Sequence, residues 1–196
     1  MTLPRGRHGL SREEVAATQR DRILRATAEA MSASGYAETS VADIIKVAGV
    51  SRETFYEQFA SKQDCFVAAL EHAIATLRAN MRASAPKSGT RQDMFIAQLR
   101  TYLDALAAEP AMSKLFLVEV FAAGEPAMRR RRQLQEQFSE TLAETMGAKS
   151  AADRFACAAF VAATSSLVTA RIAEGDAQGV RALRAPLTAL ARRLFA

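Results

Sequence analysis

The apolar residues of this chain recur every three or four positions over long stretches and rarely alternate at every second position. The first spacing places apolar side chains on one face of a helix, whereas alternation is typical of a strand. The stretches are rich in alanine and leucine, and glycine and proline are few, at 9 and 5 of 196 residues. Because alanine and leucine favour helices and proline breaks them, the pattern predicts an all-α protein.

Capping residues and helix breakers divide this pattern into about nine helices. The expected helices cover, approximately, residues 15–34, 41–48, 52–59, 62–82, 91–108, 112–123, 126–146, 152–174 and 185–196. Residues 86–89, with Pro86 and Gly89, form the first linker, and Pro110 and Pro186 interrupt the later segments. The segment 112–123 is apolar on nearly all sides, so we expect it in the interior.

Residues 41–59 have the layout of a helix-turn-helix. Ser40 can cap the first helix, because its hydroxyl can accept a bond from a free backbone N–H. Gly49 can take the left-handed conformation that ends this helix. Ser51 can cap the second helix, whose residues Phe55 and Phe59 point to one side.

The second helix of this unit then keeps Arg52, Thr54 and Tyr56 for its outward face. Such a helix is suited to the major groove of DNA. A plain helical hairpin is the alternative, since every all-helical protein contains capped hairpins. We favour DNA binding because the turn is only three residues long and the outward face is polar.

The charge of the chain gives modest support to DNA binding. The net charge of +5 suits an anionic partner. Charges in the first 62 residues are nearly balanced, and their basic excess lies in Arg5, Arg7 and Arg12. This arm can follow DNA phosphates or serve as a solvated tail, and both interpretations stay open.

The remaining chemistry argues against other classes of protein. Cys65 and Cys157 are isolated, so we expect no zinc site or disulfide, and a cytoplasmic location. Residues 1–10 lack the apolar core of a signal peptide, and the apolar run 155–168 is too short to span a bilayer. The two histidines, His8 and His72, belong to no catalytic or metal-binding motif. We expect no cofactor, and an all-helical enzyme or an adaptor without a DNA role is the alternative.

The stretch from about Arg20 to Leu70 resembles the N-terminal domain of the TetR family of bacterial transcriptional regulators. The resemblance is carried by Ile23-Leu24, Gly35-Tyr36, Thr39-Ser40-Val41, Ile44, Ala48-Gly49-Val50-Ser51, Thr54-Phe55-Tyr56, Phe59, Ser61-Lys62 and Leu70. It implies an N-terminal arm and DNA-binding domain at residues 1–64, and a helical effector-binding and dimerisation domain at 65–196. It also implies a homodimeric repressor that binds a palindromic operator in double-stranded DNA and is released by a small, largely apolar molecule.

The family resemblance also assigns positions that contact DNA. The matching residues are Thr39, Ser40, Ser51, Arg52, Glu53, Thr54, Tyr56 and Lys62. Arg52 can bond bidentately to guanine, and the Thr54 methyl can contact thymine. Tyr56 and Lys62 match phosphate-contacting positions. Glu57 departs from the family pattern, so we expect its carboxylate to point away from DNA or to pair with Arg52 or Lys62.

The effector site is expected among the fifth to eighth helices, which carry more large apolar residues than a minimal bundle needs. The candidate lining residues are Phe95, Leu99, Tyr102, Phe116, Glu119, Val120, Phe138, Phe160 and Thr164. Tyr102, Glu119 and Thr164 are the candidate polar contacts, and ordinary core packing is the alternative for each residue.

A dimer interface is expected from the last two long helices. The eighth helix carries small residues at Ala159, Ala162 and Ser166, and the last helix carries Leu187, Leu190 and Leu194. Pairing these faces between two copies would form a four-helix bundle.

Overall fold

The computed structural model describes residues 11–195 except 85 and 87. Its helices are α1 (Arg12–Glu38), α2 (Val41–Ala48), α3 (Arg52–Gln58), α4 (Lys62–Ala83), α5 (Arg91–Ala108), α6 (Pro110–Leu117), α7 (Glu125–Met146), α8 (Ala151–Ala173), α9 (Ala177–Ala182) and α10 (Arg184–Leu194), with a 3-10 turn η1 (Glu119–Phe121). These residues form no strand, which confirms the all-α prediction. Arg5 and Arg7 of the expected basic arm lie outside the described residues.

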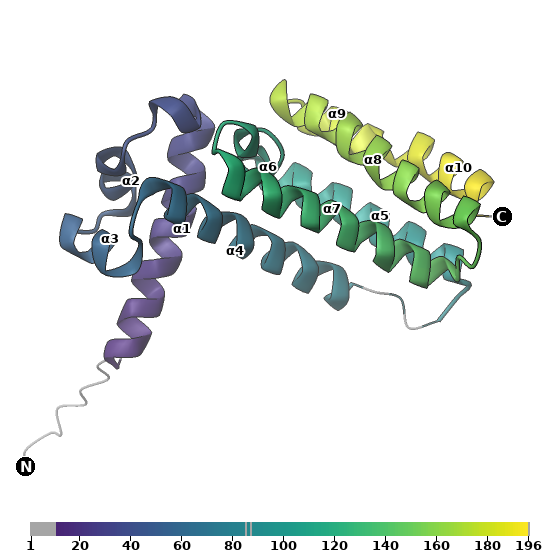
Figure 1. Ribbon diagram of the computed structural model, residues 1–196, viewed down its shortest axis with the longest axis horizontal. Helices are drawn as coiled ribbons and strands as arrows, with labels where there is room; N and C mark the ends of the chain where they lie inside the picture. The colour runs from purple at the N-terminus through teal and green to yellow at the C-terminus, as the bar shows by residue number, and fades with distance from the viewer. Residues whose placement is uncertain (1–10, 85, 87, 196) are drawn as a thin grey trace, which may run out of the picture.

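The helices form a small head and a longer body (Figure 1). Helices α1, α2 and α3 make the head at one end, and α4 leads from it along one side of the body. Helices α8, α9 and α10 lie on the opposite side, with α5 and α7 between the two sides. Helix α6 and η1 pack against α1, so the body touches the head at a point far from α4 in the sequence.

Helix α1 is longer than the sequence pattern predicts. It begins with a capping box in which the N–H of Glu14 donates to Ser11 Oγ at 3.2 Å and the N–H of Ser11 donates to Glu14 Oε2 at 2.7 Å. The bond from the Ser11 backbone, followed by that from its side chain, lowers the pKa of Glu14. Gly35, the expected end, is instead a kink with φ 82° inside the helix. The chain therefore changes direction at Gly35 and continues to Glu38.

One predicted helix in the body is too long, and one short helix was not predicted. The single helix expected at 112–123 ends at Leu117, because Val118 has φ −114° and the helical hydrogen bonding stops there. Phe121, after this break, is 55% exposed, so the segment is not buried on all sides. Helix α9 was not predicted, because six residues are too few to show a period.

The buried side chains form one continuous core through head and body. Phe55 of α3, Phe66 of α4 and Leu115 of α6 all belong to it. The predicted domain boundary between residues 64 and 65 falls in the first turn of α4, where Cys65 is fully buried. No gap in the packing therefore separates the two predicted domains. Their division at residues 64 and 65 rests on the roles expected of them and remains a prediction.

Replacing Gly49 by alanine is expected to lower the free energy of unfolding by about 1–2 kcal/mol, the cost of a left-handed residue with a side chain. Gly49 has φ 60°, and an added Cβ would lie 3.0 Å from Arg22 Nη2. Gly175 is the matched control, with φ 72° and no atom within 4 Å of its Cβ position. Urea unfolding followed by circular dichroism should show a larger loss at Gly49 than at Gly175. Equal losses would contradict a role for the Arg22 contact.

Candidate nucleic-acid interface and effector cavity

The helix-turn-helix forms as its capping residues predict. Ser40 and Asp43 make a capping box, in which the N–H of Asp43 donates to Ser40 Oγ at 3.2 Å. The Ser40 hydroxyl in turn donates to Asp43 Oδ2 at 2.6 Å, and this is the main reason that the pKa of Asp43 is lowered. Gly49 closes α2 in the left-handed conformation, and the N–H of Thr54 donates to Ser51 Oγ at 3.0 Å. Local hydrogen bonds thus define both helix starts.

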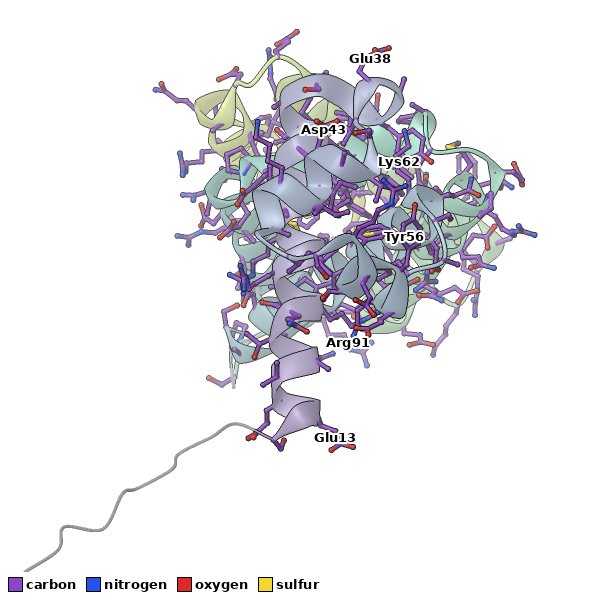
Figure 2. All side chains as sticks on the ribbon, turned by 90° about the vertical axis from the view of Figure 1, so that its left-hand side faces the viewer. Glu13, Glu38, Asp43, Tyr56, Lys62 and Arg91 are labelled. Atoms are coloured by element: carbon purple, nitrogen blue, oxygen red, sulfur yellow. The ribbon has the colours of Figure 1, made fainter. Side chains whose placement is uncertain are left out.

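Helix α3 presents a polar face to solvent (Figure 2). Phe55 and Phe59 are 0% and 2% exposed and anchor the helix, whereas Tyr56 is 46% exposed. The Arg52 guanidinium lies 5.4 Å from the centre of the Tyr56 ring, and its Nη2 is 3.5 Å from the Tyr56 oxygen. This stacking holds an exposed Arg in a defined direction, as base recognition requires.

The other α3 residues predicted to contact DNA also lie on this end of the molecule. Ser51 and Glu53 are exposed and Thr54 is half-buried, with the Thr54 and Ser51 hydroxyl oxygens 2.9 Å apart. Glu57 is exposed and makes no ion pair with Arg52 or Lys62 among the described residues. A salt bridge therefore does not offset its negative charge, and the proposed contact should be weakest at this end of α3.

Thr39 differs from its predicted role. It is 2% exposed, and its hydroxyl donates to the Gly35 carbonyl at 2.7 Å. That hydroxyl is thus used to close α1 and does not face a phosphate. The neighbouring Ser40 is exposed at the N-terminus of α2, where the helix dipole favours an anion.

Lys62 also has partners within the chain. Its ammonium donates to the carbonyls of Tyr36 and Thr39, both at 2.8 Å, and to that of Ala37 at 3.4 Å. It also lies 4.4 Å from the centre of the Tyr36 ring. An ammonium has three N–H donors, and all three are used here. Lys62 therefore fastens the end of α1 to the start of α4.

Two arginines of α1 support the helix-turn-helix and were missed from sequence. Arg22 donates to the Ala48 carbonyl at 2.6 Å, where α2 ends, and Arg20 donates to the Gln58 carbonyl at 3.2 Å, where α3 ends. Cations favour the carbonyl end of a helix. The chain carries no local signal for these bonds, because the partners are 26 and 38 residues apart.

A half-open cavity of about 120 Å³ lies in the body between α5, α7 and α8, with Met81 of α4 at its edge. Six of the nine predicted effector-site residues line it, namely Phe95, Leu99, Tyr102, Phe138, Phe160 and Thr164. Burial raises the pKa of Tyr102 to about 12, so its phenol stays neutral and can donate a hydrogen bond. The cavity is mostly apolar with a few polar groups, as ligand sites are.

The other three predicted lining residues lie elsewhere, and two of them, Glu119 and Val120, follow the end of α6 at Val118. Phe116 borders a separate pocket of about 200 Å³ between α4, α5 and α6, and Val120 is fully buried in the core. Glu119 is 8% exposed and accepts the N–H of Tyr36 at 2.7 Å. Glu119 therefore joins η1 to the kink of α1 instead of lining the cavity.

Further polar contacts join the body to the head. Lys114 of α6 donates to the Ser32 carbonyl of α1 at 2.6 Å. Gln63, at the start of α4, donates to the Ala123 carbonyl at 2.8 Å. With Glu119, these bonds hold the segment from α6 to η1 against the end of α1. A movement of that segment would be transmitted to the head.

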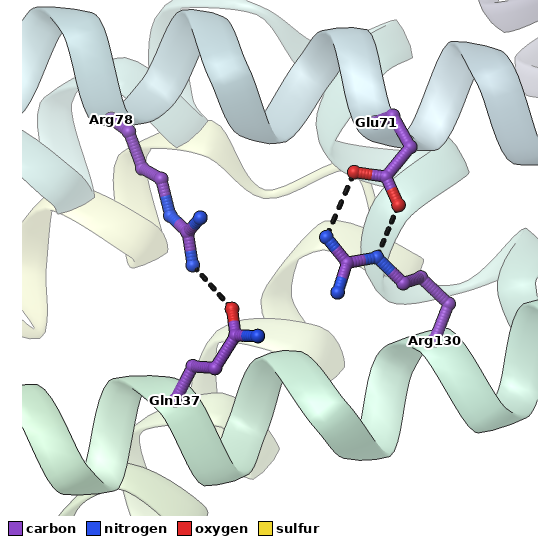
Figure 3. A network of polar contacts seen from close by, with 4 residues as sticks. All are labelled: Glu71, Arg78, Arg130 and Gln137. Atoms are coloured by element: carbon purple, nitrogen blue, oxygen red, sulfur yellow. Dashed lines mark hydrogen bonds and ion pairs between the residues drawn. The ribbon is translucent and has the colours of Figure 1, made fainter.

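Helices α4 and α7 are joined along their length by two polar pairs (Figure 3). Arg130 and Glu71 form a two-bonded ion pair, with Arg130 Nη2 2.8 Å from Glu71 Oε2. The hydrogen bond to Glu71 raises the pKa of Arg130. Arg78 donates to Gln137 Oε1 at 2.7 Å, next to the cavity residue Phe138. The wall of the cavity is therefore tied to the helix that leads to the head.

The Glu71–Arg130 pair is expected to contribute about 0.5–1 kcal/mol to stability, since the two side chains are 44% and 22% exposed and solvent weakens the attraction. A double-mutant cycle with Glu71→Gln and Arg130→Met, measured by urea unfolding, gives this coupling energy. The matched control is the Glu125–Arg132 pair, which is 66% and 55% exposed and should show almost no coupling. Equal coupling in the two cycles would contradict the link between α4 and α7.

The sequence model described as "Bacterial regulatory proteins, tetR family" matches residues 23–69, which cover the end of α1, the helix-turn-helix and the start of α4. This part of the chain therefore belongs to the DNA-binding domain of the TetR family. TetR-family regulators are DNA-binding proteins without enzymatic activity. A comparison with curated proteins found no match.

Solved structures of TetR-family regulators share the fold over most of this chain. The fatty acid degradation regulator FadR from Bacillus halodurans superposes with a TM-score of 0.77 at 18% identity, covering 88% of this chain and 94% of its own. A TetR-like regulator from Rhodococcus sp. RHA1 superposes with a TM-score of 0.73 at 18% identity, covering 94% of this chain and 97% of its own. FadR from Bacillus subtilis in complex with stearoyl-CoA superposes with a TM-score of 0.73 at 18% identity, covering 87% of this chain and 96% of its own. At these identities, the likeness establishes a shared fold.

Helix α8 is longer than the apolar run considered from sequence, and by length and composition alone it could cross a membrane. Core helices of water-soluble proteins meet the same criteria. One face of α8 packs along α7 and also contacts α6 and α9. The buried residues of α8, among them Phe160 and Val168, form this face, and the opposite face of the helix is exposed.

Proposed function

We propose that this TetR-family chain is a cytoplasmic homodimeric repressor. Two copies of α3 read the half-sites of a palindromic operator, and a small apolar effector in the body releases the DNA. Residues 1–64 form the DNA-binding domain, and residues 65–196 bind the effector and dimerise. The observation that carries this proposal is the exposed Arg52–Tyr56 face of α3, held on buried Phe55 and Phe59.

The proposed DNA contacts divide into two kinds. Arg52 and Thr54 read base edges in the major groove, because a guanidinium bonds bidentately to guanine and a threonine methyl contacts thymine. Ser40, Ser51 and Tyr56 hold phosphates, which set the register of the protein on the duplex. Glu53 borders the same face. Its carboxylate repels phosphates, so it disfavours binding registers that would bring a phosphate next to it.

The effector proposal rests on the cavity between α5, α7 and α8. Its volume of about 120 Å³ is below the roughly 300–1,000 Å³ of drug-sized sites, so we propose a small effector. B. subtilis FadR, in complex with stearoyl-CoA, has a similar fold. This supports an apolar ligand here, although the cavity as it stands is too small for a long acyl chain.

The proposed dimer uses the outer face of α8. Ala159, Ala162 and Ser166 are exposed there, and Leu194 of α10 is 43% exposed. Leu187 is 2% exposed and packs in the core of its own chain, so the α10 contribution is narrower than the sequence pattern suggested. Small residues allow two helices to approach closely, which suits a four-helix bundle of α8 and α10 from two copies.

The proposed switch follows from geometry. Two α3 helices must lie about 34–36 Å apart to enter successive major grooves on one face of B-DNA. An effector that prefers a different spacing shifts the population away from the DNA-binding state, and DNA must weaken effector binding reciprocally. The α4–α7 pairs and the contacts of α6 and η1 with α1 are the physical route for this coupling.

A footprinting experiment tests the proposal. The purified chain is incubated with duplexes covering the DNA around its own gene, and with random duplexes, at several salt concentrations. We expect protection of one short palindrome by two protomers, and a decline in affinity with salt. Equal binding to all duplexes would contradict operator recognition. Protection that no small apolar molecule reverses would leave DNA binding intact and remove the effector role.

A further inference from the structure

The lining of the proposed effector cavity is mostly apolar, and the hydroxyls of its α7 residues Thr141 and Thr145 donate to carbonyls of their own helix. We call the part lined by Phe95 and Phe160 the apolar end and the part lined by Tyr102 and Thr164 the polar end. At the apolar end, Phe95 of α5 and Phe160 of α8 pack edge to face, with ring centres 5.5 Å apart. Tyr102 lies two helical turns further along α5, roughly 10 Å away along the helix axis. Thr164 and Ser165 of α8 also line the cavity, and Arg131 is the common neighbour of Ser165 and Tyr102.

Arg131 of α7 lies beside the polar end. Its Nη2 is 3.5 Å from Ser165 Oγ, and its guanidinium stacks 4.7 Å from the centre of the Phe121 ring. Burial lowers the pKa of Arg131, while the neighbouring Tyr102 acts in the opposite direction. Its charge is thus partly withdrawn from water at the edge of an apolar cavity.

Arg131 lacks the anion that its neighbours on α7 have. Arg130 pairs with Glu71, and Arg132 pairs with Glu125. Across the described residues, no carboxylate lies within ion-pair distance of Arg131. A partly buried guanidinium without a counter-ion is unfavourable, and an anionic ligand would relieve this.

Thr164 provides an independent sign of a missing ligand at the same end. It is 6% exposed, and its Oγ1 has no hydrogen-bond partner among the described residues. Buried hydroxyls normally have a partner, so an unpaired one lining a cavity calls for an explanation. A carboxylate has two acceptor oxygens and can bond to a guanidinium and a hydroxyl at once.

We propose that the effector is a small amphipathic monocarboxylate, with its carboxylate bound by Arg131 and Thr164 and its apolar body directed towards Phe95 and Phe160. This inference rests on the proposed effector function of the cavity. Tyr102 donates a further hydrogen bond to the carboxylate, since its phenol is neutral. The volume of about 120 Å³ is close to the roughly 150 Å³ that accommodates a benzene molecule in a protein core, which limits the apolar body to a short chain or one ring.

Calorimetric titration of the full chain with pentanoate, 1-pentanol and pentylamine at pH 7 tests the proposal. Each of the three has five carbons in a straight chain, and their head groups are negative, neutral and positive. We expect pentanoate to bind at least tenfold more tightly than 1-pentanol, and pentylamine to bind most weakly. Arg131→Gln should remove the preference for pentanoate and leave 1-pentanol binding unchanged. Arg129→Gln, an exposed arginine on the same helix, is the matched control and should bind all three ligands as the unaltered chain does.

The outcomes test the carboxylate assignment separately from the proposed function of the protein. Equal binding of pentanoate and 1-pentanol by the unaltered chain, or unchanged pentanoate binding by Arg131→Gln, would overturn the carboxylate assignment. Release of operator DNA by 1-pentanol alone would then still support an apolar effector. Failure of all three to bind would also overturn the assignment, while the footprint decides operator recognition separately. Circular dichroism confirms that the variants are folded, and the ligand series on the unaltered chain needs no variant.

Discussion

Alanine in place of Arg52 is expected to lower affinity for the operator by about tenfold to a hundredfold per half-site, the usual worth of a bidentate contact between arginine and guanine. Both protomers of the proposed dimer lose the contact, so the two losses multiply on a full palindrome. Arg52 is exposed at the start of α3, and stacking on Tyr56 directs its guanidinium. Fluorescence anisotropy with the operator and with a random duplex measures the effect.

The pattern of loss distinguishes base reading from phosphate binding. If Arg52 reads a base, its removal lowers specific affinity far more than random affinity and relaxes the preference at one position in each half-site. Arg82→Ala is the control, because Arg82 is an exposed arginine at the far end of α4. A loss for Arg52→Ala that is the same on both duplexes would assign the residue to phosphate instead.

Features that depend on neighbouring residues could be predicted from the sequence. The caps at Ser40 and Ser51 and the left-handed Gly49 have the conformations expected of them. Each involves bonds within four residues along the chain, so the residue types carry the information. The inward placement of Phe55 follows from helical spacing in the same way.

Features that depend on which helices meet could not be predicted. Glu119 was assigned to the cavity, yet it bonds to Tyr36, 83 residues earlier. Thr39 is expected from the family resemblance to contact DNA, yet its hydroxyl bonds to the Gly35 carbonyl at the kink of α1. A single sequence shows that a face is polar but not which surface it meets. Arg131 could not be singled out for the same reason. The sequence shows four consecutive arginines on α7, and only the structure shows that Arg130 pairs with Glu71 and Arg132 with Glu125.

Removing the Lys62 ammonium is expected to lower the free energy of unfolding by about 2–3 kcal/mol, because hydrogen bonds to charged groups contribute roughly 1.5–3 kcal/mol and the freed carbonyls are partly buried. The ammonium bonds to the carbonyls of Tyr36 and Thr39 and stacks on the Tyr36 ring. Lys62→Met keeps most of the side-chain length and removes the charge. Urea unfolding followed by far-ultraviolet circular dichroism measures the loss, since the chain has no tryptophan.

This stability loss separates the two roles open to Lys62. A phosphate contact alone predicts unchanged stability and a shallower salt dependence of DNA binding. A clamp between α1 and α4 predicts lower stability, weaker binding to all duplexes alike and an unchanged salt slope, because the helix-turn-helix loses its support and not a phosphate contact. Lys46→Ala is the control, since Lys46 is exposed on α2 and bonds to no other described residue through its ammonium. We expect the clamp result, because the three N–H donors of Lys62 are already used within the chain.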